Sequence, residues 1–171
     1  LRPTPIKSAV GQRTVVVGFD AACGIALIEL NDPERANVLS QRLSADLHRA
    51  IQRVHDLPCL NSVIIQGRGR HFCAGADPYA QSDLALPAMA AADVHMTEVL
   101  SSLGSICAPV IAAVHGVLVG GAMALFMNAD YAVADAAATF QHGNLPRGVS
   151  PVGNYSQTPV HAMGRAKALH F

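Results

Sequence analysis

Hydrophobic residues follow two different spacings in the first third of the chain. Two runs rich in β-branched residues, 14–19 and 24–30, are separated by a short polar break and predict a β-hairpin. Apolar residues then recur every three or four positions, which predicts an amphipathic helix with Ser40 as its N-cap and an end before Pro58. The predicted buried stripe of this helix consists of Leu43, Leu47, Ala50, Ile51 and Val54.

The rest of the chain continues to alternate between strand-like and helix-like segments. Short apolar runs predict strands, and longer periodic segments predict helices. The expected elements are, in order, a strand at 62–66, a helix at 88–103, a strand at 109–114, a helix after Gly121, strands at 131–134 and 138–140, and helical turns within 155–171. The alternation predicts the α/β class, with residues 14–171 as one core domain and residues 1–13 as a flexible lead-in.

The glycine pair Gly120-Gly121 stands between the strand at 109–114 and a helix-compatible segment. The first N–H groups of a helix have no intrahelical partner, and glycine lets a ligand approach the main chain closely. Residues 71–77 form a second small-residue loop directly after a strand. Two such loops that face one another would offer two N–H groups to one oxygen, as in an oxyanion hole. The alternative is that the glycine pair only lets a helix pack closely on the sheet.

The composition of the chain says more about which partners it can bind than about its fold. Apolar residues make up 51% of the 171 residues, charged residues make up 14%, and the formal net charge is zero. The balance of charge gives no argument for binding nucleic acid or an acidic membrane, and the low charge hints at a buried subunit interface. No apolar run reaches the roughly 18 residues of a membrane span. The four cysteines form no C-x-x-C pair, so we expect free thiols, no metal site and a cytoplasmic location.

Three stretches of the sequence resemble the crotonase (enoyl-CoA hydratase/isomerase) superfamily. They are residues 28–39, residues 72–77, and residues 113–125 together with Asp130. The resemblance runs in order over about residues 14–171. It implies a spiral of ββα units that assembles as a homotrimer or hexamer. The family continues beyond the position of Phe171, so we expect a C-terminal helical part of that fold to be missing from this chain.

The resemblance also implies which residues contact a substrate. The backbone N–H groups of Ala76 and Gly121 match the two oxyanion donors of the family. Coenzyme A, or the phosphopantetheine arm of an acyl carrier protein, would lie against a small set of residues as part of an acyl thioester substrate, with no tightly bound cofactor. That set consists of Arg35, Ala36, Ala74 and Asp77. We expect Asp77 to order its loop rather than to act as a base.

The sequence departs from the family at both positions where hydratases carry a catalytic glutamate. These positions hold Ala124 and Asn144, neither of which exchanges a proton at neutral pH. Water addition requires a general base and a general acid, so the usual hydratase mechanism should fail. The one-base isomerase mechanism of the family uses the position of Asn144 and is in doubt for the same reason.

His142 is the remaining candidate for proton transfer. It lies two residues before Asn144, and in an extended segment the two side chains would share a face. A histidine that titrates near neutrality could protonate an enolate or hold a carboxylate, although His142 could equally be a loop histidine bonded to backbone. Tyr155 and Ser150 are lesser candidates.

Three functions remain open at this point. Decarboxylation of a thioester with a carboxylate on its acyl group generates the enolate without a base. It is the leading hypothesis. The expected role is in polyketide or fatty acid metabolism. Related decarboxylases carry a lysine where this chain has Pro78, so that subgroup is a poor match. Isomerisation or dehydration through His142 is the second hypothesis, and an inactive binding or scaffold subunit is the third.

Overall fold

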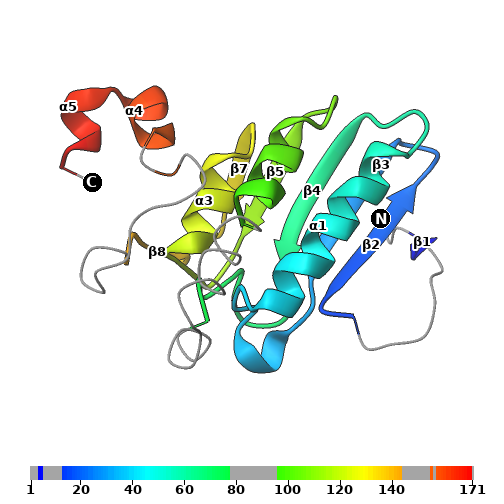
Figure 1. Cartoon of the computed structure of the whole chain (residues 1–171), viewed down its shortest axis with the longest axis horizontal. Helices are drawn as coiled ribbons and strands as arrows, with labels where there is room; N and C mark the ends of the chain where they lie inside the picture. Colours follow the sequence, from blue (N-terminus) through cyan, green and yellow to red (C-terminus); the bar gives the residue numbers. More distant parts are fainter. Residues whose placement is uncertain (1–3, 6–12, 78–95, 144–154, 156, 171) are drawn as a thin grey trace.

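A mixed six-stranded sheet forms the centre of the computed structural model, which describes residues 4–5, 13–77, 96–143, 155 and 157–170. The strand order is β1-β2-β3-β4-β5-β7 (Figure 1). The strands are β1 (Thr4–Pro5), β2 (Val15–Asp20), β3 (Ile25–Leu30), β4 (Ser62–Gly67), β5 (Val110–Val114) and β7 (Tyr131–Ala134). The strands β6 (Val117–Val119) and β8 (Thr139–Gln141) pair in a separate small sheet.

Strand direction divides the large sheet into two parts. β2 and β3 form the predicted antiparallel hairpin. β2 begins and ends one residue later than expected, and β3 begins one residue later. β3, β4, β5 and β7 are then paired in parallel, which confirms the predicted α/β class. Thr4 and Pro5 pair with β2, residues 6–12 lie outside the described residues, and the flexibility of the lead-in stays a prediction.

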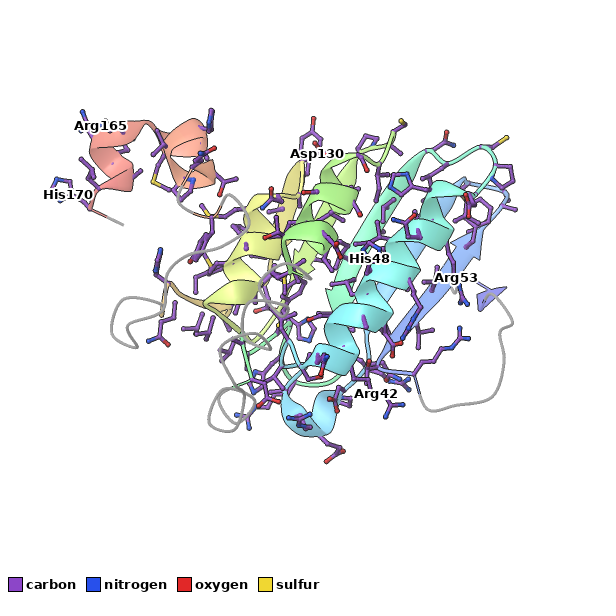
Figure 2. The ribbon with its side chains drawn as sticks, viewed as in Figure 1. Arg42, His48, Arg53, Asp130, Arg165 and His170 are labelled. Carbon is purple, nitrogen blue, oxygen red and sulfur yellow. The ribbon has the colours of Figure 1, made fainter. Side chains whose placement is uncertain are left out.

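Helices cover one face of the sheet (Figure 1). They are α1 (Gln41–His55), a helix at 96–104 and α3 (Gly121–Met127). Ser40 caps α1 as predicted, since its side chain accepts a hydrogen bond from the N–H of Leu43. The predicted stripe of α1 is buried, while Arg42 and Arg53 lie on its exposed side (Figure 2). The first part of the predicted helix at 88–103 lies outside the described residues.

The strand β6 was not predicted, and Gly116 explains why it exists. The apolar run after β5 bends at Gly116, which has φ +61°, and a Cβ there would lie 2.1 Å from the carbonyl oxygen of Arg70. The bend separates β6 from the large sheet and lets it pair with β8, where Val119 is opposite Gln141. The last part of the chain is partly helical, as expected, in α4 (Thr158–Met163) and α5 (Arg165–Ala168). No helix among the described residues is long and apolar enough to cross a membrane.

Asn37 joins the turn after β3 to the loop after β4. Its side chain is completely buried, and its Nδ2 lies 3.0, 2.9 and 3.2 Å from the carbonyl oxygens of Arg68, His71 and Phe72. Its Oδ1 accepts a hydrogen bond from the N–H of Asp32 at 2.8 Å. The residue also has φ +54°, a conformation that asparagine tolerates better than most side chains. One amide therefore joins the turn that carries Arg35 and Ala36 to the loop that carries Ala76.

We expect Asn37→Ala to lower the free energy of unfolding by roughly 2–4 kcal/mol, because buried carbonyl groups and a buried N–H lose their partner. Chemical denaturation measures the loss. Asn61→Ala is the matched control, since Asn61 is exposed and donates one hydrogen bond, to the carbonyl oxygen of Cys23. Equal losses in the two variants would show that the Asn37 amide has no special role.

The buried thiol of Cys73 makes the stability of the fold depend on pH in the alkaline range. Its side chain is fully buried, and burial raises the pKa of its thiol from 9.0 to about 12 although a backbone hydrogen bond with Gly75 acts in the opposite direction. The thiol of the unfolded chain ionises near its ordinary pKa, whereas that of the folded chain stays protonated. The contribution of this thiol to stability is therefore fully present below about pH 9 and is lost as the pH rises toward the pKa of the folded chain.

We expect the free energy of unfolding to fall between pH 9 and 10 with a slope that approaches roughly 1.4 kcal/mol per pH unit. Denaturation with urea at a series of pH values measures this slope. Cys73→Ala should flatten it, and Cys107→Ala, which removes an exposed thiol, should leave it unchanged. A slope that is the same in all three proteins would contradict the assignment to Cys73.

Candidate active site

Two loops that follow neighbouring parallel strands lie side by side at the same edge of the sheet. The loop after β4 and the segment of β6 are joined by backbone hydrogen bonds. The N–H of Cys73 donates to Val117, the N–H of Val119 donates to Cys73, and both bonds measure 3.3 Å. Cys73 also forms a parallel bridge with Leu118, and both residues are fully buried. This contact brings the two predicted small-residue loops together.

Gly75 makes the approach of the two loops close. It has φ +87°, and a Cβ at this position would lie 2.4 Å from the carbonyl oxygen of Val119 and 3.7 Å from the nitrogen of Gly121. A Cβ placed on Gly121 would in turn lie 3.9 Å from the nitrogen of Ala76. The backbones of Ala76 and Gly121, the two predicted donors, are therefore neighbours in space.

Neither predicted donor uses its backbone N–H in a hydrogen bond within the described part of the chain. Within the part of the chain that the structure describes, no hydrogen bond from the N–H of Ala76 or of Gly121 is found. Their neighbours are paired instead, since the carbonyl oxygen of Gly75 accepts from Leu39 at 2.8 Å and that of Gly120 accepts from Met123 at 2.8 Å. Gly121 is the first residue of α3, a position where an N–H lacks an intrahelical partner. The two N–H groups are neighbours without a hydrogen-bond partner among the residues described, and their joint donation to one oxygen atom stays a prediction.

The residues predicted to contact coenzyme A also gather beside these donors. The short 3-10 helix η1 (Pro33–Arg35) ends at Ala36, whose carbonyl oxygen accepts from the N–H of Ala74 at 3.0 Å. Arg35 Nη2 lies 2.5 Å from Oδ2 of Asp77, and the Asp77 side chain is 8% exposed. The ion pair ties Asp77, the residue after the first donor, to η1, which supports the expected ordering role of Asp77. Contact of these residues with coenzyme A stays a prediction.

Ala124 lies on α3 about one turn beyond Gly121, and its side chain is buried. The buried methyl group supplies no carboxylate at this position. The carbonyl oxygen of Ala124 accepts hydrogen bonds from the backbone N–H and the Nδ2 of Asn128 at 3.1 and 2.7 Å. The second substituted position, Asn144, lies outside the described residues, as do Ser150 and Pro78.

His142 lies directly after β8, next to the turn formed by Gly120 and Gly121, the glycine turn. The carbonyl oxygen of Gln141 accepts a hydrogen bond from the N–H of Gly120 at 2.9 Å, and a Cβ on Gly143 would lie 3.7 Å from that same nitrogen. The ring of His142 stacks on Tyr155 with a centroid distance of 4.7 Å and an interplanar angle of 18°. The structure therefore brings the backbone on both sides of His142 close to Gly120, and it pairs the ring of His142 with that of Tyr155.

The contact between Tyr155 and His142 was not anticipated. Tyr155 is 1% exposed, and burial raises the pKa of its phenol from 10.0 to about 12. The signal in the sequence was an aromatic residue directly after a loop rich in glycine and proline. Such a residue can be recognised in advance as a packing anchor, but the partner of its ring cannot.

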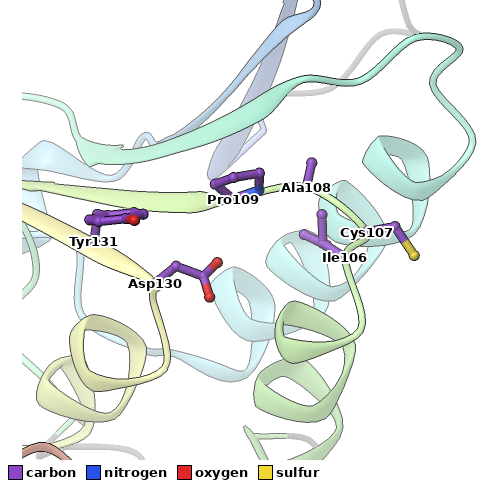
Figure 3. Close-up of a pocket in the computed structure, with 6 residues that line it drawn as sticks. All are labelled: Ile106, Cys107, Ala108, Pro109, Asp130 and Tyr131. Atoms are coloured by element: carbon purple, nitrogen blue, oxygen red, sulfur yellow. The ribbon is translucent and has the colours of Figure 1, made fainter.

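A separate open pocket of about 520 Å³ lies at the opposite end of the sheet, at the starts of β5 and β7 (Figure 3). Asp130, one of its lining residues, accepts a hydrogen bond from the N–H of Val110 at 2.8 Å. This carboxylate therefore fixes the connection between two strands. Because the loops with Ala76 and Gly121 follow the carboxyl ends of the parallel strands, the pocket does not contain the predicted donors.

Similarity to known proteins agrees with this geometry. The enoyl-CoA hydratase/isomerase family description matches residues 20–171. A probable enoyl-CoA hydratase, EchA14 of Mycobacterium tuberculosis, is 35% identical over 144 residues, which cover 82% of this chain and 55% of that protein. The mevalonyl-coenzyme A hydratase sidH of Aspergillus fumigatus is 34% identical, with 84% of this chain and 53% of that protein covered. The chain thus spans about half the length of the curated relatives it matches.

Solved structures show the same fold. A crystal structure of an enoyl-CoA hydratase from Bacillus anthracis has a TM-score of 0.85 at 24% identity, covering 92% of this chain and 61% of that one. A putative enoyl-CoA hydratase/isomerase from Mycobacterium abscessus has a TM-score of 0.83 at 28% identity, covering 91% and 61%. The α/β architecture, the paired loops and the sequence match agree, and the chain belongs to the enoyl-CoA hydratase/isomerase family of the crotonase superfamily.

Proposed function

We propose that this chain binds an acyl thioester and stabilises its enolate through the backbone N–H groups of Ala76 and Gly121. The observation that carries the proposal is that the N–H groups of Ala76 and Gly121 are neighbours and have no hydrogen-bond partner among the described residues. Because the chain spans about half of its relatives, the activity of the whole protein is part of the same proposal. The names of the relatives support coenzyme A as the carrier of the acyl group.

The chemistry follows from where negative charge develops. When a carbanion forms at the carbon next to a thioester carbonyl, the charge moves onto the carbonyl oxygen. Two fixed N–H donors bind that oxygen more strongly in the transition state than in the substrate, which lowers the barrier. Backbone donors keep their positions without side-chain reorganisation. The pair therefore favours any reaction that passes through a thioester enolate.

Decarboxylation is the proposed reaction, because it requires no general base to make the enolate. The bond between Cα and the carboxylate breaks, its electron pair forms the double bond of the enolate, and CO₂ leaves. Ala124 replaces a carboxylate that would repel an acidic acyl group, and the carboxylate of Asp77 is paired with Arg35. A proton then adds to Cα, and His142 is the proposed donor. The enzyme would be a lyase.

Isomerisation or dehydration through His142 is the second candidate, favoured by the position of this histidine beside the glycine turn. A family member that binds thioesters without turnover is the third. An acyl carrier protein as partner, assembly as a homotrimer or hexamer, and contact of coenzyme A with Arg35 and Ala74 are further parts of the proposal. The four cysteines are free, which supports a reducing, cytoplasmic location.

We expect Gly121→Pro to lower kcat/KM for an acyl thioester by roughly 10²–10³-fold relative to Gly121→Ala, because proline deletes one donor. Proline is tolerated at the first position of a helix, where the N–H is unpaired in any case. Both variants add a Cβ that meets Leu39 Cδ1 at 3.1 Å, so alanine controls for the added bulk. Equal kinetics for two well-folded variants would contradict the role of this N–H.

We expect His142→Ala to slow CO₂ release from malonyl-CoA or methylmalonyl-CoA by less than about tenfold, since bond cleavage needs no base. A general base or acid contributes roughly 10²–10⁴-fold, so a loss of that size in double-bond migration would favour isomerisation instead. His161→Ala, which removes an exposed histidine of α4, is the control. Absence of CO₂ release from malonyl, methylmalonyl and glutaconyl thioesters, on coenzyme A and on carrier protein, would exclude decarboxylation.

A further inference from the structure

His71 lies at the start of the contact between the two loops that carry the predicted donors. Its ring nitrogen Nδ1 accepts a hydrogen bond from the backbone N–H of Val117 at 3.2 Å, and the residue is half-buried. Val117 is the first residue of β6, the strand that leads into Gly121. His71 itself lies five residues before Ala76 on the other loop. The ring therefore links the two segments that carry the donors, and the proposed chemistry assigns it no role.

The ring occupies a place that a main-chain carbonyl group would otherwise fill. Cys73 continues the same contact with backbone groups alone, since its N–H donates to Val117 and its carbonyl oxygen accepts from Val119. In this parallel pattern, the N–H of Val117 would donate to the carbonyl oxygen of residue 71. That oxygen instead lies 2.9 Å from Nδ2 of the buried Asn37. The side chain of His71 thus supplies the acceptor in place of its own carbonyl group.

Gly116 allows the ring to come this close to the main chain. A Cβ on Gly116 would lie 2.8 Å from Nδ1 of His71 and 2.1 Å from the carbonyl oxygen of Arg70. The residue before the bend, His115, accepts a hydrogen bond from the N–H of Phe72 at 2.9 Å through its carbonyl oxygen. The main chain on both sides of the ring is therefore fixed, and the fold sets where the acceptor lies.

The hydrogen bond also determines which nitrogen of the ring carries a proton. A backbone N–H can only donate, so Nδ1 presents a lone pair and the proton of the neutral ring lies on Nε2. A proton on Nδ1 would set two donors against one another at the first residue of β6. An amide oxygen in the same place could replace Nδ1, whereas an apolar group could not. The contact therefore requires an acceptor and not merely the bulk of a ring.

Two further contacts connect His71 to the donors. Cys73 forms a parallel bridge with Leu118. Gly75 then lies so close to Val119 that an added Cβ would be 2.4 Å from its carbonyl oxygen. Successive residues of one loop thus meet successive residues of the other, and the series ends at the predicted donors. Because β6 has only three residues, a displacement of its first residue reaches the glycine turn within one short segment.

We infer that His71 is a positioning residue: Nδ1 holds β6 against the loop after β4 and so sets the spacing between the N–H groups of Ala76 and Gly121. The inference rests on the proposed function, because this spacing matters for chemistry only if both groups bind the oxygen of a thioester. An error of about 1 Å in the position of one donor can lower the rate by up to about a hundredfold. Binding of the substrate in its ground state depends on the spacing much less.

Two substitutions of similar shape test the inference. His71→Leu removes the acceptor, whereas His71→Asn places an amide oxygen at the same bond distance from the backbone as Nδ1. With release of CO₂ from malonyl-CoA as the assay, we expect His71→Leu to lower kcat by roughly tenfold to a hundredfold while KM stays within about twofold. His71→Asn should restore kcat to within about threefold of the wild type, because the N–H of Val117 regains an acceptor.

His55→Leu is the control for loss of a histidine hydrogen bond elsewhere. His55 is the last residue of α1, it is exposed, and its Nε2 lies 3.1 Å from the carbonyl oxygen of Ser102. This substitution should leave both kcat and KM unchanged. A folded His71→Leu with the kcat of the wild type, or a His71→Asn as slow as His71→Leu, would overturn the inference.

Nuclear magnetic resonance gives readouts that do not depend on turnover. In the wild type at neutral pH, the nitrogen signals of the His71 ring should be those of an unprotonated Nδ1 and a protonated Nε2. The backbone amide signals of Ala76 and Gly121 should shift in His71→Leu and stay close to the wild type in His71→Asn. A protonated Nδ1 in the folded wild type would overturn the inference even if no variant folds.

The kinetic and spectroscopic results separate failure of this inference from failure of the proposed function. If the wild type releases CO₂ and a folded His71→Leu does so equally fast, the role of His71 is wrong and the thioester site stands. If the wild type turns over no malonyl, methylmalonyl or glutaconyl thioester, the proposed reaction fails. The amide signals of Ala76 and Gly121 then decide on their own, since a shift in His71→Leu supports the positioning role and unchanged signals overturn it.

Discussion

The backbone contact between the loop after β4 and the segment that leads into α3 is the constraint on which the site depends. It exists because Gly75 and Gly116 adopt positive φ angles where a side chain would collide with a carbonyl oxygen, at 2.4 Å and 2.1 Å respectively. Neither glycine carries chemistry. Together they let two main chains approach until the N–H groups of Ala76 and Gly121 are neighbours, so the geometry of the donor pair is set by the absence of two side chains.

The donor pair and its surroundings give different information about function. The predicted donors are backbone groups, so their chemistry does not depend on side-chain identity. The described side chains of the candidate site include a buried methyl group at Ala124 and a stacked pair of rings at His142 and Tyr155. The carboxylate of Asp77, the residue after Ala76, is paired with Arg35. The backbone geometry therefore agrees with the proposed stabilisation of an enolate, whereas the group that moves a proton stays a proposal.

The sequence predicted those features that depend on local periodicity or on a whole motif. The helix after Ser40, the β2–β3 hairpin and the closeness of Ala76 to Gly121 belong to this group. The strand β6 was missed because a single bend at Gly116 divides one apolar run between two sheets. The contacts of the Asn37 amide with three carbonyl groups and the ring partner of Tyr155 were missed for a related reason, since each joins residues whose separation in the chain carries no information on contact.

The parallel pairing of β3, β4, β5 and β7 also has a consequence for how the protein reaches its folded state. Each pairing joins segments that a crossover separates, so the entropy of closing a long loop must be overcome before the strands stabilise one another. Ala76 lies in the connection between β4 and β5, and Gly121 lies in the connection between β5 and β7. Each connection by itself supplies a single N–H group. The closeness of Ala76 to Gly121 therefore arises only after the long-range pairing is complete, and a chain that stops earlier in folding lacks it.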